Sequence, residues 1–418
     1  MPVSAARCGR SNWKCKPRCR SGDANVSRKN FRSKPTATVG FFPHSRRPAR
    51  QARRQNLLLR TLVGAIELQV WYGYDSVRQT WGCPMRQRWG LLPYQRFSPA
   101  LEDKVLFTAT ATGTYEQAAA VASKWGCPMD DSTVHALVQR MGARAEEQTQ
   151  ARLKTLPQEI APTRAPSALA VVMVDGFLVR FRGNGWGQQQ STEPHAPWHE
   201  IKTGLFYCVE AASVNESGRG LLSEKVTVSW QGPAVALGER LHHEAMRRGL
   251  GRARAVEALG DGAEWIWNLV QARWNQAVQV LDFYHASQHL WELARALHGA
   301  DEAKVSAWVE KRRHALRHGR EKEVLREFAR VKAPRGERGK IVRREQNYFA
   351  SQSGRLGYET VAARGWPIGS GAVESACRQR QCRYKRPGQF WTPSGLRHLC
   401  ALEEARAHGH WDQLWSTN

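Results

Sequence analysis

Three acidic residues carry the chemistry that this sequence could perform. Asp175 and Asp261 each end a short apolar run and precede a glycine, and Glu374 follows the turn Gly369-Ser-Gly371 onto a helix. Acids at the carboxyl ends of strands point into the crevice where open α/β sheets bind ligands. Carboxylates suit Mg²⁺, and two ions about 3.5–4 Å apart can activate the attacking oxygen and stabilise the leaving oxygen of a phosphodiester. The sequence therefore predicts that these acids are catalytic and hold two Mg²⁺ ions, for which Mn²⁺ can substitute.

Each acid also has a structural explanation when it is considered alone. The dipeptide Asp175-Gly176 is typical of a hairpin turn, with Phe177–Phe181 as the returning strand. Asp261 can cap the helix that follows it, and Glu374 can pair with Arg378 one helical turn later. The combination of three such acids on a basic chain favours the metal site.

The charge balance points to a polyanionic partner. The chain has 63 Lys and Arg residues against 37 Asp and Glu residues, for a formal net charge of +26, and such a charge attracts nucleic-acid phosphates at long range. Cations follow Glu374 on the same predicted helix, near an aromatic ring that can stack on an unpaired base. This predicted DNA surface consists of Arg378, Arg383, Lys385, Arg386 and Trp391.

Membrane and secretory classes are disfavoured. No apolar run approaches the roughly 20 residues of a membrane-spanning helix, and residues 1–20 lack the apolar core of a secretory signal. We therefore expect a cytoplasmic protein without a membrane partner.

The nine cysteines are scattered along the chain, unlike the dense disulfide frame of a small secreted domain, so we expect reduced thiols. Three of them lie in the N-terminal tail without a fourth ligand at zinc-site spacing: Cys8, Cys15 and Cys19. A second zinc interpretation combines Asp282 with His285 and His289, which are one helical turn apart. The glutamate of an HExxH motif is missing there, and a histidine pair on a helix surface is the simpler alternative.

Composition and periodicity divide the chain into six segments. We expect a disordered basic arm at 1–61, a small β module at 62–98, a helix-turn-helix-like DNA-binding domain at 99–155, the first part of an α/β core at 164–290, a helical insertion at 291–358, and completion of the core by the Glu374 helix and a C-terminal helix at 359–418. In the third segment, helices at Thr114–Lys124 and Thr133–Met141, the latter capped by Asp131-Ser132, flank a tight turn. Two packed helices are also the commonest unit of any small α domain, so both interpretations stay open.

The core segment begins with strands and then alternates strand and helix. Strand-like runs lie at Ala168–Val174, Phe177–Phe181, Gly204–Ala211 and Lys225–Trp230, followed by a helix at Ala234–Arg248, a strand at Ala253–Leu259, a helix at Ala263–Trp274 and a strand at Ala277–Phe283. Alternation predicts parallel pairing. An antiparallel start followed by βαβ crossovers is the order of the ribonuclease H fold, so we predict a ribonuclease H-like mixed α/β core.

Five segments resemble the DDE transposases of bacterial insertion sequences, most closely the ISKra4 type. They are Val174-Asp-Gly176, Trp198–Gly204, Gly260–Ile266, Leu281–His285 and Trp366–Glu374, within a span from about Leu62 to Trp415. The resemblance implies Asp175, Asp261 and Glu374 as the catalytic triad. It also implies a ribonuclease H core interrupted by helices before the glutamate, and magnesium-dependent cutting and joining of DNA.

The resemblance implies roles for further residues. Asp261 and Asp282 both follow strands, so either can be the second metal ligand. We choose Asp261, because Asp282-Phe-Tyr-His285 fits an accessory element that follows the second acid in related transposases and orients DNA or the active site. Lys202 lies in a matching segment and can hold a phosphate. At 62–98 the resemblance implies a zinc-ribbon-like module, whereas this chain has Cys83 alone.

The resulting hypothesis is a transposase that binds the terminal inverted repeats of its own insertion sequence through residues 62–155 and the basic arm. It would pair two DNA ends as a homo-oligomer and join them to target DNA at the bacterial nucleoid. Two alternatives remain. A structure-specific nuclease of ribonuclease H fold would cut branched DNA without joining it, and a catalytically decayed DNA-binding protein would bind DNA without magnesium-dependent turnover.

Overall fold

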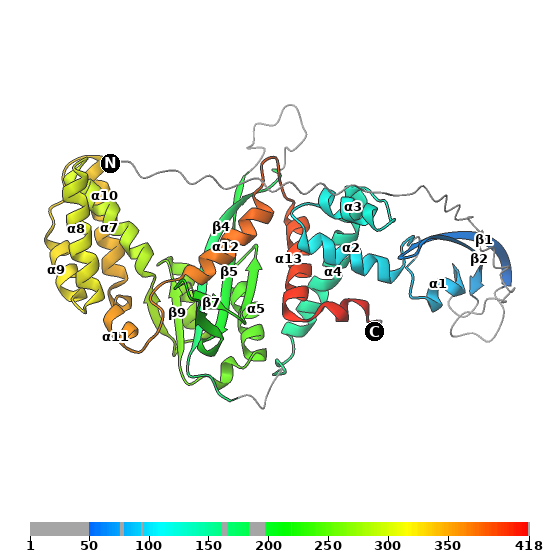
Figure 1. The fold of residues 1–418 in the computed structure, drawn as a ribbon, viewed down its shortest axis with the longest axis horizontal. Helices are drawn as coiled ribbons and strands as arrows, with labels where there is room; N and C mark the ends of the chain where they lie inside the picture. The colour runs from blue at the N-terminus through cyan, green and yellow to red at the C-terminus, as the bar shows by residue number, and fades with distance from the viewer. Residues whose placement is uncertain are drawn as a thin grey trace, which may run out of the picture. The chain divides into compact units, whose positions relative to one another are not determined.

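The chain forms two compact units, shown in the computed structural model of Figure 1. The structure describes residues 50–75, 79–92, 95–159, 165–183, 197–218 and 220–416. The first unit comprises the described residues up to Leu57 together with Leu68–Met85, and the second comprises Leu58–Glu67 and the chain from Arg86 onward. Most of the predicted disordered arm, including its three cysteines, lies outside the described residues. Within the described ranges, no helix is long and apolar enough to cross a membrane.

The first unit is a three-stranded sheet with a small core of its own. The strands β1 (Arg50–Thr61), β2 (Gly64–Asp75) and β3 (Thr80–Gly82) lie in that order, and the short helix α1 (Pro84–Arg88) follows them. Leu57, Val70 and Cys83 form its buried core. The predicted β module is therefore present.

The disordered arm was predicted to extend to residue 61, and this bound is wrong, because Arg50–Thr61 form strand β1. The guanidinium carbons of Arg53 and Arg54 lie 5.5 Å and 5.3 Å from the ring centroids of Tyr72 and Trp71 on β2. Cations held over aromatic faces are stabilised there. The basic composition that suggested disorder thus forms an ordered strand, because the neighbouring strand supplies the rings.

Helices at the start of the second unit pack against the C-terminal helix. They are α2 (Pro99–Ala111), α3 (Tyr115–Lys124) and α4 (Asp131–Leu153), with α13 (Pro393–His408) and the 3₁₀ turn η4 (Trp411–Trp415) at the other end of the chain. A Cβ atom at Gly142 would clash with the backbone of His398, so α4 and α13 approach each other closely. The predicted helix-turn-helix segment therefore belongs to the same compact unit as the core.

The boundaries of α4 differ from the sequence prediction. Asp130 caps the helix by accepting a hydrogen bond from the Thr133 amide at 2.7 Å, in place of Asp131-Ser132. The helix continues to Leu153, well beyond the predicted end at Met141. Packing of its buried face against α13 explains the extra turns, because tertiary contact stabilises helix that local sequence does not require.

A five-stranded mixed sheet forms the centre of the second unit (Figure 1). Its strands are β4 (Ala170–Arg180), β5 (Trp198–Cys208), β8 (Val226–Trp230), β9 (Val256–Gly260) and β10 (Val278–Leu281). The order is β10-β9-β4-β5-β8; β4–β5 and β5–β8 are antiparallel, and β4–β9 and β9–β10 are parallel. The predicted antiparallel start and parallel continuation are confirmed.

The alternative of a hairpin turn at Asp175-Gly176 is excluded. These residues continue a single strand and pair with Thr203 and Lys202 of β5. The strands predicted at Ala168–Val174 and Phe177–Phe181 are thus one, and Asp175 lies within it rather than at its end. Burial of apolar side chains before and after the dipeptide, on both faces of the sheet, favours the continuous strand over the local turn.

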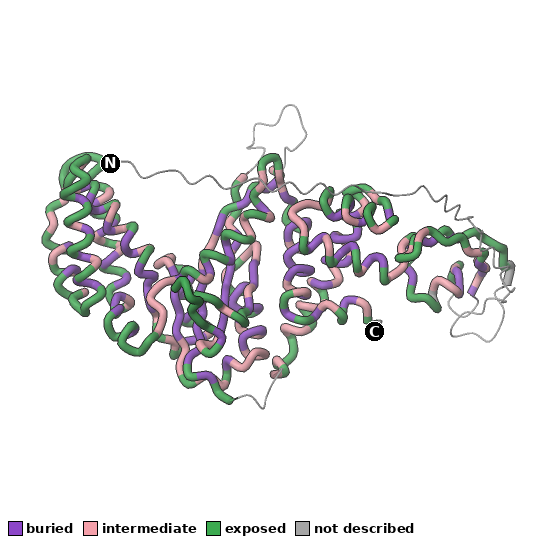
Figure 2. The backbone as a smooth tube through the Cα atoms, in the orientation of Figure 1, coloured by how far each residue is buried: buried purple, intermediate pink, exposed green. Residues whose placement is uncertain are grey.

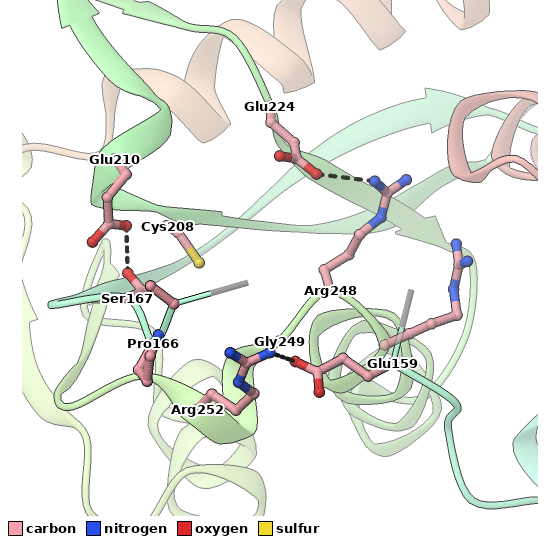
Figure 3. Close-up of a pocket in the computed structure, with 11 residues that line it drawn as sticks. Glu159, Pro166, Ser167, Cys208, Glu210, Glu224, Arg248, Gly249 and Arg252 are labelled. Atoms are coloured by element: carbon pink, nitrogen blue, oxygen red, sulfur yellow. Dashed lines mark hydrogen bonds and ion pairs between the residues drawn. The ribbon is translucent and has the colours of Figure 1, made fainter. Parts of the chain in front are cut away.

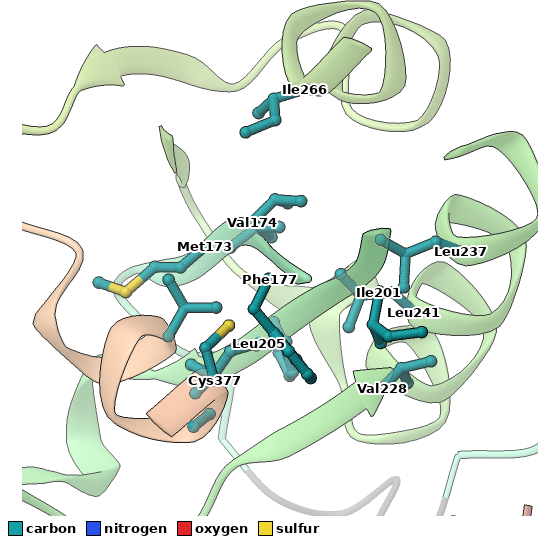
Figure 4. Close-up of a cluster of buried hydrophobic side chains, with 14 of the residues drawn as sticks. Met173, Val174, Phe177, Ile201, Leu205, Val228, Leu237, Leu241, Ile266 and Cys377 are labelled. Atoms are coloured by element: carbon teal, nitrogen blue, oxygen red, sulfur yellow. The ribbon is translucent and has the colours of Figure 1, made fainter. Parts of the chain in front are cut away.

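Helices cover both faces of this sheet. Successive side chains of a strand alternate between faces: a Cβ at Gly204 would clash with Leu241 of α5 (Ala234–Arg247), whereas Phe177 stacks on Tyr384 of α12 (Gly371–Tyr384) with ring centroids 6.4 Å apart. Figure 4 shows Leu237, Leu241 and Ile266 on one side of the strands and Cys377 of α12 on the other. The helix α6 (Glu264–Arg273) lies beside α5, and Figure 2 shows the strands buried between these layers.

The predicted helical insertion is present, and its helices begin before residue 291 and end after residue 358. It contains α7 (Phe283–His298), α8 (Glu302–Arg317), α9 (Glu321–Arg330), α10 (Glu337–Ser351) and α11 (Tyr358–Ala363). The Gly- and Arg-rich sequence after α9 forms α10, whose Val342 and Phe349 are fully buried. The remaining elements are short: β6 (Ala212–Val214), β7 (Gly220–Leu222), η1 (Val209–Ala211), η2 (Leu250–Arg252) and η3 (Ser353–Arg355).

One buried acid in the sheet has no partner. Glu257 on β9 is fully buried, and neither of its carboxylate oxygens accepts a hydrogen bond. Burial raises the pKa of Glu257 to about 8. The unfolded chain releases this proton near pH 4.5, so the folded state binds the proton more tightly and loses stability as pH rises between these values.

We expect Glu257→Gln to remove this loss. Each unit of pKa shift corresponds to about 1.4 kcal/mol, so the variant should exceed the wild type in unfolding free energy by a few kcal/mol at pH 8.5 and match it near pH 4.5. Denaturant unfolding across that range measures the difference, with the exposed Glu116→Gln as control. Parallel pH profiles for wild type and Glu257→Gln would contradict the prediction.

Candidate active site

Asp175 is a half-buried carboxylate on the central strand of the sheet. Its Oδ1 accepts a hydrogen bond from the Gly176 amide at 2.7 Å, and the thiol of Cys377 on α12 is a second hydrogen-bonding partner. Thr203, opposite Asp175 on β5, also bonds to Cys377. Burial raises the pKa of Asp175 above its ordinary value, which marks a carboxylate held in unfavourable surroundings.

The structure brings the other two predicted acids into the same neighbourhood. The negative charges of Asp261 and Glu374 add to burial in raising the pKa of Asp175. Asp261 directly follows β9, the parallel neighbour of β4, and Glu374 lies in the first turn of α12, which packs on β4. Two acids from distant parts of the sequence therefore lie close enough to Asp175 to act on it electrostatically.

Asp261 lies in a turn whose backbone carbonyls accept hydrogen bonds from Tyr348 of α10 and from Gln352, which follows that helix. Its Oδ1 accepts a hydrogen bond from the Ala263 amide at 2.9 Å, so the predicted helix-start role is partly present. The Tyr348 hydroxyl donates to the backbone carbonyl of Asp261 at 2.7 Å, and the Gln352 side chain donates to that of Gly262 at 3.1 Å. Gly262 has φ +99°, and a Cβ there would lie 2.8 Å from the Tyr348 hydroxyl. The turn therefore requires glycine.

Glu374 is exposed, and the turn before it is anchored by Asp282. The Ser370 hydroxyl donates to Glu374 Oε1 at 3.1 Å. Asp282 is buried; its Oδ2 accepts from the Ser370 amide, and its Oδ1 accepts from the His285 amide at 2.5 Å. The Phe283 amide also donates to the Ile368 carbonyl at 2.9 Å. Asp282 thus connects the start of α7 to the turn that carries Glu374, and His285 contributes its backbone amide.

This anchoring bears on two alternatives from the sequence. Both oxygens of Asp282 are engaged by backbone amides, so Asp261 is the better placed second acid. The zinc interpretation, which combined His285 and His289 with Asp282, is weakened for the same reason, because the Asp282 carboxylate is bound to backbone amides. His289 instead pairs with Glu345 at 2.5 Å and stacks on Tyr348 with ring centroids 3.7 Å apart.

The predicted DNA surface divides into exposed and structural residues. Arg378 and Lys385 are exposed on α12. Lys202 is less available, because its ammonium group pairs with Glu200 at 2.7 Å and lies 5.3 Å from the Trp265 ring centroid.

Three residues of the predicted DNA surface instead contact other parts of the fold. Arg383 donates to the Ala109 carbonyl at 2.9 Å, and Arg386 contacts the α2–α3 turn at Gly113. Trp391 is buried, and its indole N–H donates to the Tyr384 carbonyl at 2.8 Å. The prediction that Trp391 stacks on a base is therefore wrong: the ring completes the core.

Sequence reasoning missed an exposed aromatic residue beside the cations. Trp198, at the start of β5, is 44% exposed. The charged groups of Arg180 and Lys385 lie 4.8 Å and 4.9 Å from its ring centroid. The sequence gives no indication that Lys385 lies near Trp198, because the two residues are brought together only by the packing of α12 on strands β4 and β5.

The donor chemistry of the site fits a hard divalent cation. Burial and the negative charges of Asp261 and Glu374 raise the pKa of Asp175, and a bound cation relieves such repulsion. Within the described ranges, no group of three or more His, Cys, Asp or Glu side chains is already arranged to hold a metal ion. Mg²⁺ keeps several of its own waters and needs few direct protein ligands, so an open set of carboxylates is compatible with it.

A separate cavity of about 250 Å³ lies at the opposite end of β4 (Figure 3). Its lining includes Ser167, just before the strand, and three arginines that are already paired. Arg247 pairs with Glu244 at 2.9 Å. Arg248 pairs with Glu224 at 3.0 Å, and Arg252 pairs with Glu159 at 3.1 Å. This balanced set of charges does not contribute to the carboxylate site.

Comparison with known proteins adds no functional assignment. No protein-family profile matches this chain, and no curated protein sequence matches it significantly. The functional argument therefore rests on the residues and geometry described above.

We predict that Asp282→Asn destabilises the protein and loosens the turn before Glu374. The new amide keeps one acceptor but turns a donor toward a backbone N–H, at a cost of about 1–3 kcal/mol in unfolding free energy. Hydrogen exchange should become faster in the turn at 366–371. The exposed Asp412→Asn is the matched control. Unchanged stability and exchange in Asp282→Asn would contradict the anchoring role.

Proposed function

We propose that this protein cuts and joins DNA with Asp175, Asp261 and Glu374 as its catalytic acids. The observation that carries the proposal is the electrostatic convergence of these three carboxylates on a strongly basic chain. Carboxylate clusters that hold divalent ions are suited to phosphodiester chemistry. In keeping with the sequence resemblance, we propose a transposase that acts on the inverted repeats of its own insertion sequence.

The topology supports this proposal. The first strand of the core, β4, lies at the centre, with antiparallel β5 and β8 on one side and parallel β9 and β10 on the other. A sheet of this order is compatible with the proposed ribonuclease H-like core. The helical insertion between β10 and α12 separates the second acid from the third, as the resemblance implies.

The charged surface of α12 supports DNA as the substrate. Glu374 and Arg378 are four residues apart on α12, so they share one face of the helix, and Lys385 follows directly after its last residue. Both cations are exposed and can neutralise phosphates next to the scissile bond. The cluster of Trp198, Arg180 and Lys385 extends this surface to the end of the hairpin.

The chemistry follows from these positions. Asp175, Asp261 and Glu374 would hold two Mg²⁺ or Mn²⁺ ions, which when bound lower the pKa of an attacking water and stabilise the leaving oxygen. Asp282 and Ser370 fix the turn that presents Glu374, and Tyr348 fixes the turn that presents Asp261. The 3′ hydroxyl freed by the first cut attacks target DNA, so no covalent protein intermediate is required. Pairing of two ends requires a homo-oligomer.

We expect Asp175→Asn, Asp261→Asn and Glu374→Gln each to lower metal-dependent cleavage of end DNA by more than about 100-fold. Even outer-shell partners of metal ligands typically contribute 10- to 100-fold. Affinity for the same DNA should stay near the wild-type value, and the exposed Glu337→Gln should cleave normally. The substrate is a duplex carrying the inverted repeats that flank the gene.

The outcomes separate three functions. An Asp261→Asn protein that cleaves like the wild type would contradict the assignment. Cleavage of branched DNA without strand joining would identify a structure-specific nuclease. DNA binding by the wild type without any metal-dependent turnover would identify a decayed DNA-binding protein.

A separate prediction concerns the hydrogen bond between Tyr348 of α10 and the turn that contains Asp261. Tyr348→Phe removes one hydrogen bond to the Asp261 carbonyl, worth about 1 kcal/mol, while the stacked ring is retained. We expect a higher Mg²⁺ concentration for half-maximal cleavage and little change in DNA affinity. An unchanged metal dependence would show that the turn does not need this bond.

A further inference from the structure

A second basic feature, here called the α12–α13 groove, lies beside the helix that carries Glu374. It has a volume of about 430 Å³ and is formed by the α2–α3 turn (Thr110–Gly113), β8, α12 and α13. The α12 residues that line it include Gln379, Cys382 and Arg383. Glu374 is not among them, so the groove is distinct from the carboxylate site.

The groove carries an excess of positive charge. Four cations line it, Lys225, Arg380, Arg383 and Arg406, against the single acid Glu403. That acid is already matched, because Arg380 and the Tyr384 hydroxyl both donate to Glu403. Ordinary protein surfaces mix charges of both signs, so a groove of this composition favours an anionic occupant.

Two of these cations are available to a ligand. Lys225 forms no ion pair within the described ranges, and it is exposed. Arg406 likewise has no ion-pair partner there; its guanidinium carbon lies 5.4 Å from the Phe107 ring centroid. By contrast, Arg380 and Arg383 already interact with Glu403, and Arg383 also donates to the Ala109 carbonyl. These two arginines therefore add positive potential to the groove, but their N–H groups are already used.

The exposed surface of α12 connects the groove to the carboxylates. Arg378 and Cys382 are both exposed: Arg378 lies one helical turn after Glu374, and Cys382, one turn further on, lines the groove. A helix with its side chains is about 10–12 Å wide, which is a short distance for a nucleic-acid backbone to cross. A nucleic-acid backbone that crossed α12 over Arg378 would meet Cys382, which lines the same groove as Lys225.

We propose that the α12–α13 groove binds the phosphate backbone of the DNA that continues from the scissile bond. The proposal rests on the proposed function and extends it, because it assigns the position of flanking DNA. Arg378 contacts the backbone as it crosses α12, and Lys225 and Arg406 contact it in the groove. The α2–α3 turn forms one side of the groove, and its Gly113 lies against the guanidinium group of Arg386.

Salt dependence of DNA binding tests the charge contacts. Each neutralised phosphate contributes about 0.9 to the slope of log affinity against log salt concentration, so a Lys225→Ala and Arg406→Ala double variant should lower the slope by nearly two. A matched double variant on the helical insertion, Lys311→Ala and Lys322→Ala, removes the same charge from exposed positions and should leave the slope unchanged. Equal slopes for the wild type and the groove variant would overturn the proposal.

Cys382 allows a test that leaves the groove intact. Among the described cysteines it alone is exposed, and Cys8, Cys15 and Cys19 can be changed to serine. End DNA carrying an activated disulfide on a backbone tether should exchange with the Cys382 thiol and release the small thiol. We expect crosslinking only from tethers that flank the cleavage site, and its loss in Cys382→Ser. The half-buried Cys208, in the other cavity, should not react.

The two hypotheses can fail separately. If the Asp261→Asn protein binds end DNA but Cys382 crosslinks from no tether position, the groove is not the DNA path and the proposed function stands. If Cys382 crosslinks from flanking tethers while the wild type shows no metal-dependent cleavage, the groove assignment stands and the catalytic proposal fails.

Discussion

Repulsion between three carboxylates is the constraint on which the rest of the core depends. Asp175 is half-buried on the central strand, and burial together with the charges of Asp261 and Glu374 disfavours its ionised form. The hydrogen bonds around these acids come mainly from neutral groups, such as the Gly176 and Ala263 amides and the Ser370 hydroxyl. They position the oxygens without cancelling the negative charge, so the cluster remains an attractor for cations.

The helical insertion takes part in this arrangement. Asp282, at the start of α7, holds the Ser370 amide, and Tyr348 of α10 holds the Asp261 carbonyl. Its first and fourth helices therefore fix the turns that carry two of the three acids. A shift of either helix would move one acid relative to Asp175, so the insertion controls the geometry of the carboxylate site.

Sequence reasoning predicted most of the sheet, because apolar periodicity is a local signal, and glycine-flanked acids drew attention to three carboxylates that the fold brings near one another. It misplaced features that depend on distant partners. The Asp175-Gly176 dipeptide has the composition of a turn, yet pairing with β5 keeps it in a strand. Trp391 lies among cations in the sequence, yet its ring fills the core. The basic β1 strand needs the rings of β2, and α10 needs the core of the insertion, so neither could be recognised from its own composition.

The central claim is that the three carboxylates share bound metal. Crystals of the protein soaked in Mn²⁺ would test it most directly, because the anomalous scattering of manganese locates the ion without reference to activity. We predict a peak contacted by the side chains of Asp175, Asp261 and Glu374, and its loss in Asp261→Asn. Manganese bound elsewhere, with no peak at these three acids, would contradict the claim.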